Sequence, residues 1–92
     1  MAQRWPIQPG SYEYTRSDGT GGVNTVAADG TFSNTRQDGT TETGTWREEA
    51  DWSCIVPSQG AERRYTFTEP DAEGRFTGTM DNGVTARMRK IG

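Results

Sequence analysis

Residues 75–90, RFTGTMDNGVTARMRK, decide the fold. Asn82-Gly83 lies between two runs in which polar and apolar residues alternate, and such a dipeptide at such a place is the strongest short-range signal of a β-hairpin. With a three-residue loop, Phe76 lies opposite Met88, and the apolar residues of both runs share one face. The stretch therefore predicts two antiparallel strands with one buried side.

The same turn signal recurs along the chain. Glycine supplies the positive φ that a tight turn needs, and a preceding Asp or Asn caps the turn locally. The other turn dipeptides are Asp18-Gly19, Asp29-Gly30, Asp38-Gly39, Gln59-Gly60 and Glu73-Gly74. The strands expected between them are 11–16, 22–28, 31–36, 40–49, 52–57, 62–69, 75–80 and 84–91. No segment has the period of an amphipathic helix. We therefore expect an all-β fold, an eight-stranded antiparallel up-and-down meander that forms a small closed or nearly closed β-barrel.

Matching the faces of neighbouring strands predicts a register. The expected opposite pairs are Phe32 and Gly44, Gly44 and Val56, Trp46 and Cys54, Cys54 and Tyr65, Tyr65 and Gly78, Phe67 and Phe76, Gly78 and Ala86, and Met80 and Val84. The residues expected inside are Tyr12, Tyr14, Val26, Phe32, Trp46, Cys54, Val56, Tyr65, Phe67, Phe76, Met80, Val84, Ala86 and Met88. These rings should fill the interior and leave no cavity of the size that a lipocalin has.

Length and composition place the chain among small single domains. With 92 residues it has one modest core, assigned to residues 10–92. Residues 1–9 form an extension, and we expect its Trp5 and Ile7 to pack on one end of the barrel. The net charge of −3 disfavours nucleic acid as a partner, and no apolar run is long enough to span a membrane.

The compartment is less directly encoded. Residues 1–6 contain no apolar segment of a signal peptide, so the chain is either cytoplasmic or a mature form without its leader. We expect a bacterial protein of the periplasm or the extracellular space, with the cytoplasm as the alternative.

Catalytic chemistry has little support. The chain contains no His, and Cys54 is expected to face aromatic rings inside the barrel, where a thiol is inert. Glu48, Glu49 and Asp51 form the densest acidic group, but they lie in a turn without a cleft. The turn aspartates alternate between barrel ends, too far apart for one Ca²⁺ ion. We therefore expect no enzyme activity, no cofactor and no metal.

Outward-facing basic residues form the best candidate for a binding site. On the last three strands these are Arg64, Arg75, Arg87 and Arg89, interspersed with threonines. Arginine suits bidentate contacts with a carboxylate, a phosphate or an acidic protein surface. The alternative is a solvated face neutralised by the acidic turn at 69–73. Trp52, at a turn edge, is either an exposed aromatic contact or a lid that packs over a barrel end.

Several short motifs resemble a known group of proteins. They are Gly44-Thr45-Trp46, Asp51-Trp52-Ser53-Cys54, Tyr65-Thr66, Gly74-Arg75-Phe76-Thr77, Gly83 and Arg87-Met88-Arg89-Lys90-Ile91. Over roughly residues 10–92 the chain resembles small exported β-meander proteins of unknown function from alphaproteobacteria. In that pattern a second Cys often precedes the tyrosine that matches Tyr65, and here Arg64 stands in its place. The resemblance implies export, and it implies no activity that can be carried over to this chain.

These observations favour a non-catalytic binding or interaction module of the cell envelope, which acts through its loops or through the outward Arg-Thr face. One alternative is an inhibitor of a lytic or proteolytic enzyme. Another is a lipocalin-like small-molecule carrier, which requires an interior cavity of about 300 Å³ or more. A third is an enzyme that uses paired carboxylates in a cleft.

Overall fold

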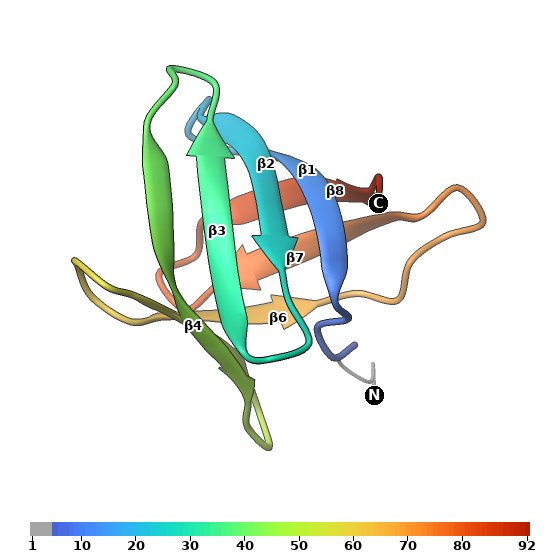
Figure 1. Ribbon diagram of the computed structural model, residues 1–92. Coiled ribbons are helices and arrows are strands. Elements are labelled where there is room, and N and C mark those ends of the chain that lie inside the picture. The colour runs from blue at the N-terminus through green and yellow to red at the C-terminus, as the bar shows by residue number, and fades with distance from the viewer. Residues whose placement is uncertain (1–4) are drawn as a thin grey trace.

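The computed structural model describes residues 5–92, which form eight strands and no helix (Figure 1). The strands are β1 (Gly10–Arg16), β2 (Gly21–Val26), β3 (Thr31–Arg36), β4 (Thr41–Glu48), β5 (Ser53–Pro57), β6 (Arg63–Phe67), β7 (Arg75–Met80) and β8 (Thr85–Lys90). Each strand pairs antiparallel with the next, and β8 pairs with β1. The predicted all-β meander is therefore confirmed, and it closes into a barrel. Over residues 5–92 there is thus no helix with the length and apolarity to cross a membrane.

Asp-Gly-Thr turns join the first four strands as hairpins. In the turn between β3 and β4, Asp38 Oδ1 accepts hydrogen bonds from the N–H (2.9 Å) and the Oγ1–H (2.7 Å) of Thr40. Gly39 in this turn has φ +90°. The same bonds recur at Asp18 and Asp29, and in all three aspartates the bonds from the following threonine lower the pKa of the carboxyl group. The turn chemistry seen in the sequence thus fixes these hairpins.

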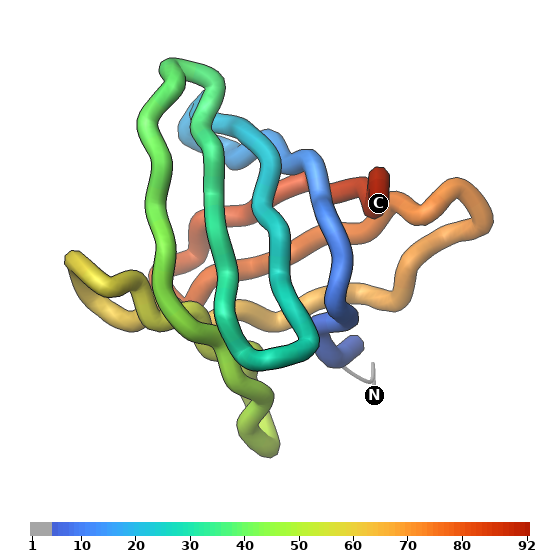
Figure 2. The backbone as a smooth tube through the Cα atoms, in the orientation of Figure 1, coloured from blue at the N-terminus to red at the C-terminus, as the bar shows by residue number. Residues whose placement is uncertain are grey.

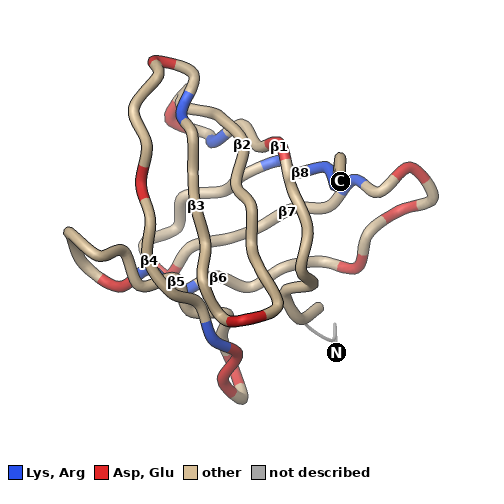
Figure 3. Tube along the Cα trace, in the orientation of Figure 1, with Lys and Arg blue, Asp and Glu red and all other residues tan. Residues whose placement is uncertain are grey.

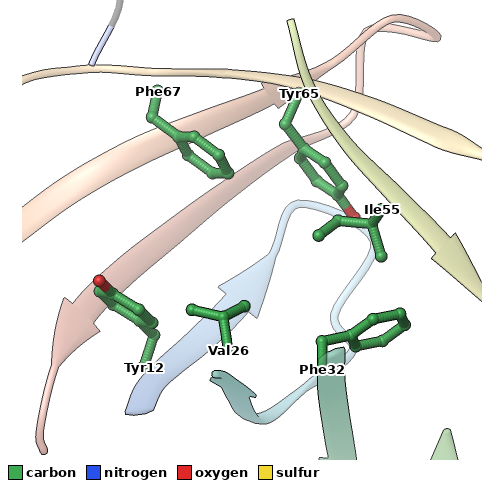
Figure 4. Packing of buried hydrophobic residues seen from close by; sticks show 6 residues of the cluster. All are labelled: Tyr12, Val26, Phe32, Ile55, Tyr65 and Phe67. Carbon is green, nitrogen blue, oxygen red and sulfur yellow. The ribbon is translucent and has the colours of Figure 1, made fainter. Parts of the chain in front are cut away.

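The register agrees with the sequence prediction between β3 and β4 and between β7 and β8. Phe32 lies opposite Gly44, and Phe76 lies opposite Met88. The buried core consists of Tyr12, Val26, Phe32, Ile55, Tyr65 and Phe67. Figure 4 shows these six side chains, which come from β1, β2, β3, β5 and β6, pointing toward the barrel centre. Ile7, Trp46, Phe76, Met80 and Met88 pack against them.

The register predicted for β5 is wrong by one residue. Trp46 lies opposite Ile55 rather than Cys54, and Pro57 rather than Val56 lies opposite Gly44. The turn between β4 and β5 has four residues, 49–52, closed by a hydrogen bond from Glu49 N–H to Trp52 O (2.8 Å). A three-residue loop was expected there. Because β5 contains three consecutive apolar residues, the sequence does not show which of them points inward. The longer turn places Ile55 on the inside.

This shift corrects the positions of Cys54 and Val56, which were predicted to face the interior. Cys54 lies opposite Arg47 on one side and Arg64 on the other, so it belongs to the outer face and not beside Tyr65. It is nevertheless fully buried. Its Sγ–H donates to Glu49 Oε1 at 3.1 Å, and burial raises the pKa of the thiol.

The register between β6 and β7 is wrong by two residues, which keeps the predicted faces but changes the partners. Phe67 lies opposite Gly78 instead of Phe76, and Tyr65 lies opposite Met80. The connection at 68–74 is longer than expected and extends away from the barrel (Figure 2). The Phe67 and Phe76 rings still meet edge to face, with 5.7 Å between their centroids.

Candidate functional site

The barrel interior contains a cavity of about 160 Å³. This volume is below that of a lipocalin-like site, as predicted, but the expectation that the rings fill the interior is wrong. The apolar part of the wall comes from Tyr12, Val26, Phe32, Ile55, Tyr65, Phe67, Phe76, Ala86 and Met88. An apolar cavity of about 150 Å³ is large enough to bind one benzene molecule. The interior therefore has room for a ligand with a single ring or a short chain.

The segment 5–8, ahead of β1, lies over one end of this cavity and lines it. Trp5 N–H donates to Phe67 O at 2.9 Å, and Ile7 N–H donates to Glu48 Oε2 at 3.2 Å. The hydroxyl of Tyr12 donates to the carbonyl oxygen of Gln8. This is the end on which Trp5 and Ile7 were expected to pack, and residues 1–4 of the predicted extension lie outside the described residues.

Polar side chains line the opposite end of the cavity. Arg16, Asn24, Asn34 and Arg63 all contribute to its wall. Alternation along the strands brings them inside: Arg16 continues the inward row of Tyr12 and Tyr14 in β1, and Arg63 begins the inward row of β6. These positions meet at one end of the barrel, because β1 ends there with Arg16 and β6 begins there with Arg63.

Hydrogen bonds order much of this polar end. The Tyr14 hydroxyl donates to Asn34 Oδ1 at 2.8 Å, and both residues are buried. The guanidinium group of Arg16 lies 5.0 Å from the centroid of the Tyr14 ring, and its Nη2–H donates to the Tyr65 hydroxyl at 3.4 Å. Arg16 is thus held by aromatic groups, and no ion pair joins it to a carboxylate among residues 5–92.

Glu42 is the inward carboxylate at this end. Arg63 Nη2–H donates to Glu42 Oε1, and Arg36 Nη2 lies 3.3 Å from Glu42 Oε2. Burial raises the pKa of Glu42, but the hydrogen bond and charge of Arg63 and the charge of Arg36 outweigh it and hold the pKa below its ordinary value. The carboxylate is therefore charged at neutral pH and is shared by two guanidinium groups.

The lowered pKa of Glu42 makes stability depend on pH. In acid the folded protein binds fewer protons than the unfolded chain, so this contribution is present above the ordinary Glu pKa of about 4.3 and is lost as pH falls through the lower folded value. We expect urea unfolding between pH 6 and pH 2.5 to show a shallower loss of stability in Glu42→Gln than in the parent protein. A carbon NMR titration of the parent protein provides an independent check, and a Glu42 midpoint at or above about 4.3 contradicts the prediction.

Two buried polar atoms at this end have no hydrogen-bond partner among the described residues, namely Asn24 Oδ1 and Arg63 Nε. An unsatisfied buried donor or acceptor costs about 1–3 kcal/mol, and native proteins retain few of them. Both residues line the cavity. The cavity wall thus includes two residues with an unpaired polar atom, and the protein encloses both of these atoms.

The outward arginines predicted as a binding face are only partly brought together. Arg75, Arg87 and Arg89 line one open groove on the outside of β1, β2, β7 and β8, whereas Arg64 lies outside this groove. Figure 3 shows basic positions along β8 and acidic positions in the turn between β6 and β7. The ion pairs of these arginines are Arg64 with Glu62 (3.3 Å), Arg75 with Glu73 (3.0 Å) and Arg89 with Glu13 (2.9 Å).

Arg87 is exposed and has no ion pair among residues 5–92. Trp52, the other predicted contact, is half-buried at the turn between β4 and β5. A binding role for these residues stays a prediction. Surface ion pairs of this kind neutralise most of the basic face, which makes the interior the stronger candidate site.

The residues that line the polar end were missed in the sequence analysis, although the signal was present. Continuing the two-residue period of each inward row leads from Tyr12 and Tyr14 to Arg16, and backward from Phe67 and Tyr65 to Arg63. The sequence analysis assigned the outward arginines from the register and did not extend the inward rows to Arg16 and Arg63. No group of three or more His, Cys, Asp or Glu residues is placed to hold a metal ion within the described part of the chain.

Comparisons with protein-family models, with curated proteins and with solved structures find no match for this chain. By its fold the chain belongs to the closed eight-stranded antiparallel barrels, and its interior contains a small cavity.

Proposed function

We propose that the protein is a non-catalytic binding module whose barrel interior holds one small molecule with a single ring or a short chain. The observation that carries this proposal is the cavity of about 160 Å³, bounded by apolar side chains and, at one end, by the polar side chains of Arg16, Asn24, Asn34 and Arg63. Ligand sites are typically apolar concavities with a few convergent polar groups. Among the functions expected from the sequence, the cavity favours the small-molecule carrier. Its ligand would be much smaller than that of a lipocalin.

Filling the cavity with a side chain tests this function. Val26 is 3% exposed and lines the cavity, so Val26→Phe places a ring in the ligand volume. Toluene added to the parent protein is expected to shift NMR signals of inward residues such as Tyr12 and Ile55, and Val26→Phe is expected to abolish these shifts.

Val23→Phe provides the matched control, because Val23 lies on the same strand, is 37% exposed and does not line the cavity. This variant should bind toluene like the parent protein. If Val26→Phe does not fold, Ala86→Leu fills the same volume with a smaller side chain. Failure of toluene to shift any inward residue of the parent protein refutes the proposal.

A further inference from the structure

The polar end of the cavity carries an excess of positive charge. At this end of the barrel lie three guanidinium groups, on Arg16, Arg36 and Arg63, and one carboxylate, on Glu42, and of these Arg16 and Arg63 line the cavity. Arg36 and Arg63 share Glu42, whereas the Arg16 guanidinium group contacts the Tyr14 ring and the Tyr65 hydroxyl. The balance of these four groups is +2, and part of it lies beside the enclosed cavity. Charged groups interact more strongly there than at the surface.

Carboxylates in the nearby turns offset part of this charge, since the charge of Arg16 helps to lower the pKa of Asp18 and the charge of Arg36 helps to lower the pKa of Asp38. Asp18 and Asp38 lie in turns at the same end, and both are exposed and hydrogen-bonded to their own threonines. Water and salt screen charges at such positions. The interior balance therefore decides which charge a ligand prefers.

The donors in the cavity wall fit an anionic group. Arg16 and Arg63 line the cavity, and a guanidinium group presents its donors in a planar fork that matches a carboxylate. Asn24 also lines the cavity, and its side-chain amide carries an NH₂ donor beside its oxygen. Each of these side chains can therefore donate to an anion at the end of the apolar cavity.

From this charge balance and from the guanidinium groups in the cavity wall we infer that the interior ligand is a small carboxylate, with its ring or chain against the apolar wall and its carboxylate at Arg63 and Arg16. This inference rests on the proposed function and adds the chemical class of the ligand. A single-ring carboxylate such as benzoate matches both the cavity volume and the charge.

Benzoate and benzyl alcohol separate the effect of charge from the effect of size, because both carry one ring. We expect benzoate to bind the parent protein about 10-fold more tightly than benzyl alcohol, which corresponds to about 1.4 kcal/mol. Both ligands should shift NMR signals of the same inward residues. Benzylammonium, of similar size and opposite charge, should bind most weakly.

Replacing Arg16 tests the site itself. Since Arg16 has no carboxylate partner among residues 5–92, Arg16→Gln leaves no orphaned carboxylate behind. This variant is expected to weaken benzoate binding about 10-fold and to leave benzyl alcohol binding nearly unchanged. Arg87→Gln, the same replacement on the outer face, should change neither affinity and serves as the control.

The possible results separate the inference from the proposed function. If benzyl alcohol and benzoate bind inside with equal affinity, the carboxylate inference is wrong and the proposed function stands. Loss of benzoate binding in Arg87→Gln places the anion in the outer groove and also overturns the inference. If toluene, benzyl alcohol and benzoate all fail to bind the folded protein, both the inference and the proposed function are wrong.

Discussion

Gly44→Ala is expected to lower the free energy of unfolding by about 3 kcal/mol, among the largest effects of any single methyl group added to this chain. A Cβ at Gly44 would overlap the carbonyl oxygen of Val56 and lie 2.9 Å from the Cα of Pro57. Both of these atoms belong to the backbone of β5, so no rotation of a side chain relieves the contact. It would also lie 2.7 Å from the Phe32 ring, which packs over this glycine.

Gly39→Ala is the matched control for this prediction. A Cβ at Gly39 meets no atom within 4 Å, but the backbone there has φ +90°. The same substitution therefore carries only a conformational cost, about 1–2 kcal/mol for a left-handed residue with a side chain. Urea unfolding followed by circular dichroism measures both variants. Equal losses of stability would show that close packing of β4 on β5 does not limit the residue at position 44.

The second large effect is expected for Glu42→Ala, which should lower the free energy of unfolding by about 2–3 kcal/mol. The substitution leaves Arg63 and Arg36 without their shared carboxylate inside the barrel. The expected cost is below the roughly 3–5 kcal/mol of a fully buried pair, because the side chains of Glu42 and Arg63 retain 16% and 18% exposure.

Glu13→Ala removes one carboxylate from an ion pair on the outer face. Glu13 and Arg89 have side chains that are 49% and 45% exposed, so the loss should be within about 1 kcal/mol. The double variant Glu42→Leu with Arg63→Met removes both charges of the Glu42–Arg63 pair and should recover much of the stability lost in Glu42→Ala. If Glu42→Ala and Glu13→Ala unfold at the same urea concentration, the interior carboxylate has no special structural role.

The fold could be predicted from the sequence because the turns are local. An Asp or Asn followed by Gly specifies its own conformation through bonds within a few residues, as the Asp38 to Thr40 bonds illustrate. Hairpins joined by such turns can only form a meander. Closure then follows from the number of strands and their twist, and the pairing of β8 with β1 completes it.

The register of β5 was beyond local reasoning. Cys54, Ile55 and Val56 are all apolar, so alternation does not distinguish the two faces, and the turn at 49–52 lacks a glycine that would mark its length. Tertiary packing decides instead, since Ile55 is 4% exposed in the core. Cys54 is buried on the opposite side, beside Arg47 and Glu49. The sequence prediction had treated burial and inward orientation as the same property.

The candidate site was missed for a related reason. Arg16 and Arg63 carry charges, and charged residues are usually outside. Their inward position follows from the strand period, but the cavity beside them is a property of the whole barrel. It arises where side chains from β1, β2, β3, β5, β6, β7 and β8 leave a volume unfilled, and no pairwise match between neighbouring strands contains that information.

Closure of the barrel also restricts how a macromolecular partner can bind. Every strand from β1 to β8 is hydrogen-bonded to a neighbour on each side, so no strand offers a full row of free backbone groups along an edge. Recognition by strand addition, in which a partner extends a sheet by pairing with its edge, requires such a row. A protein that docks on this barrel must therefore recognise side chains and turns, and self-association through edge pairing is blocked in the same way.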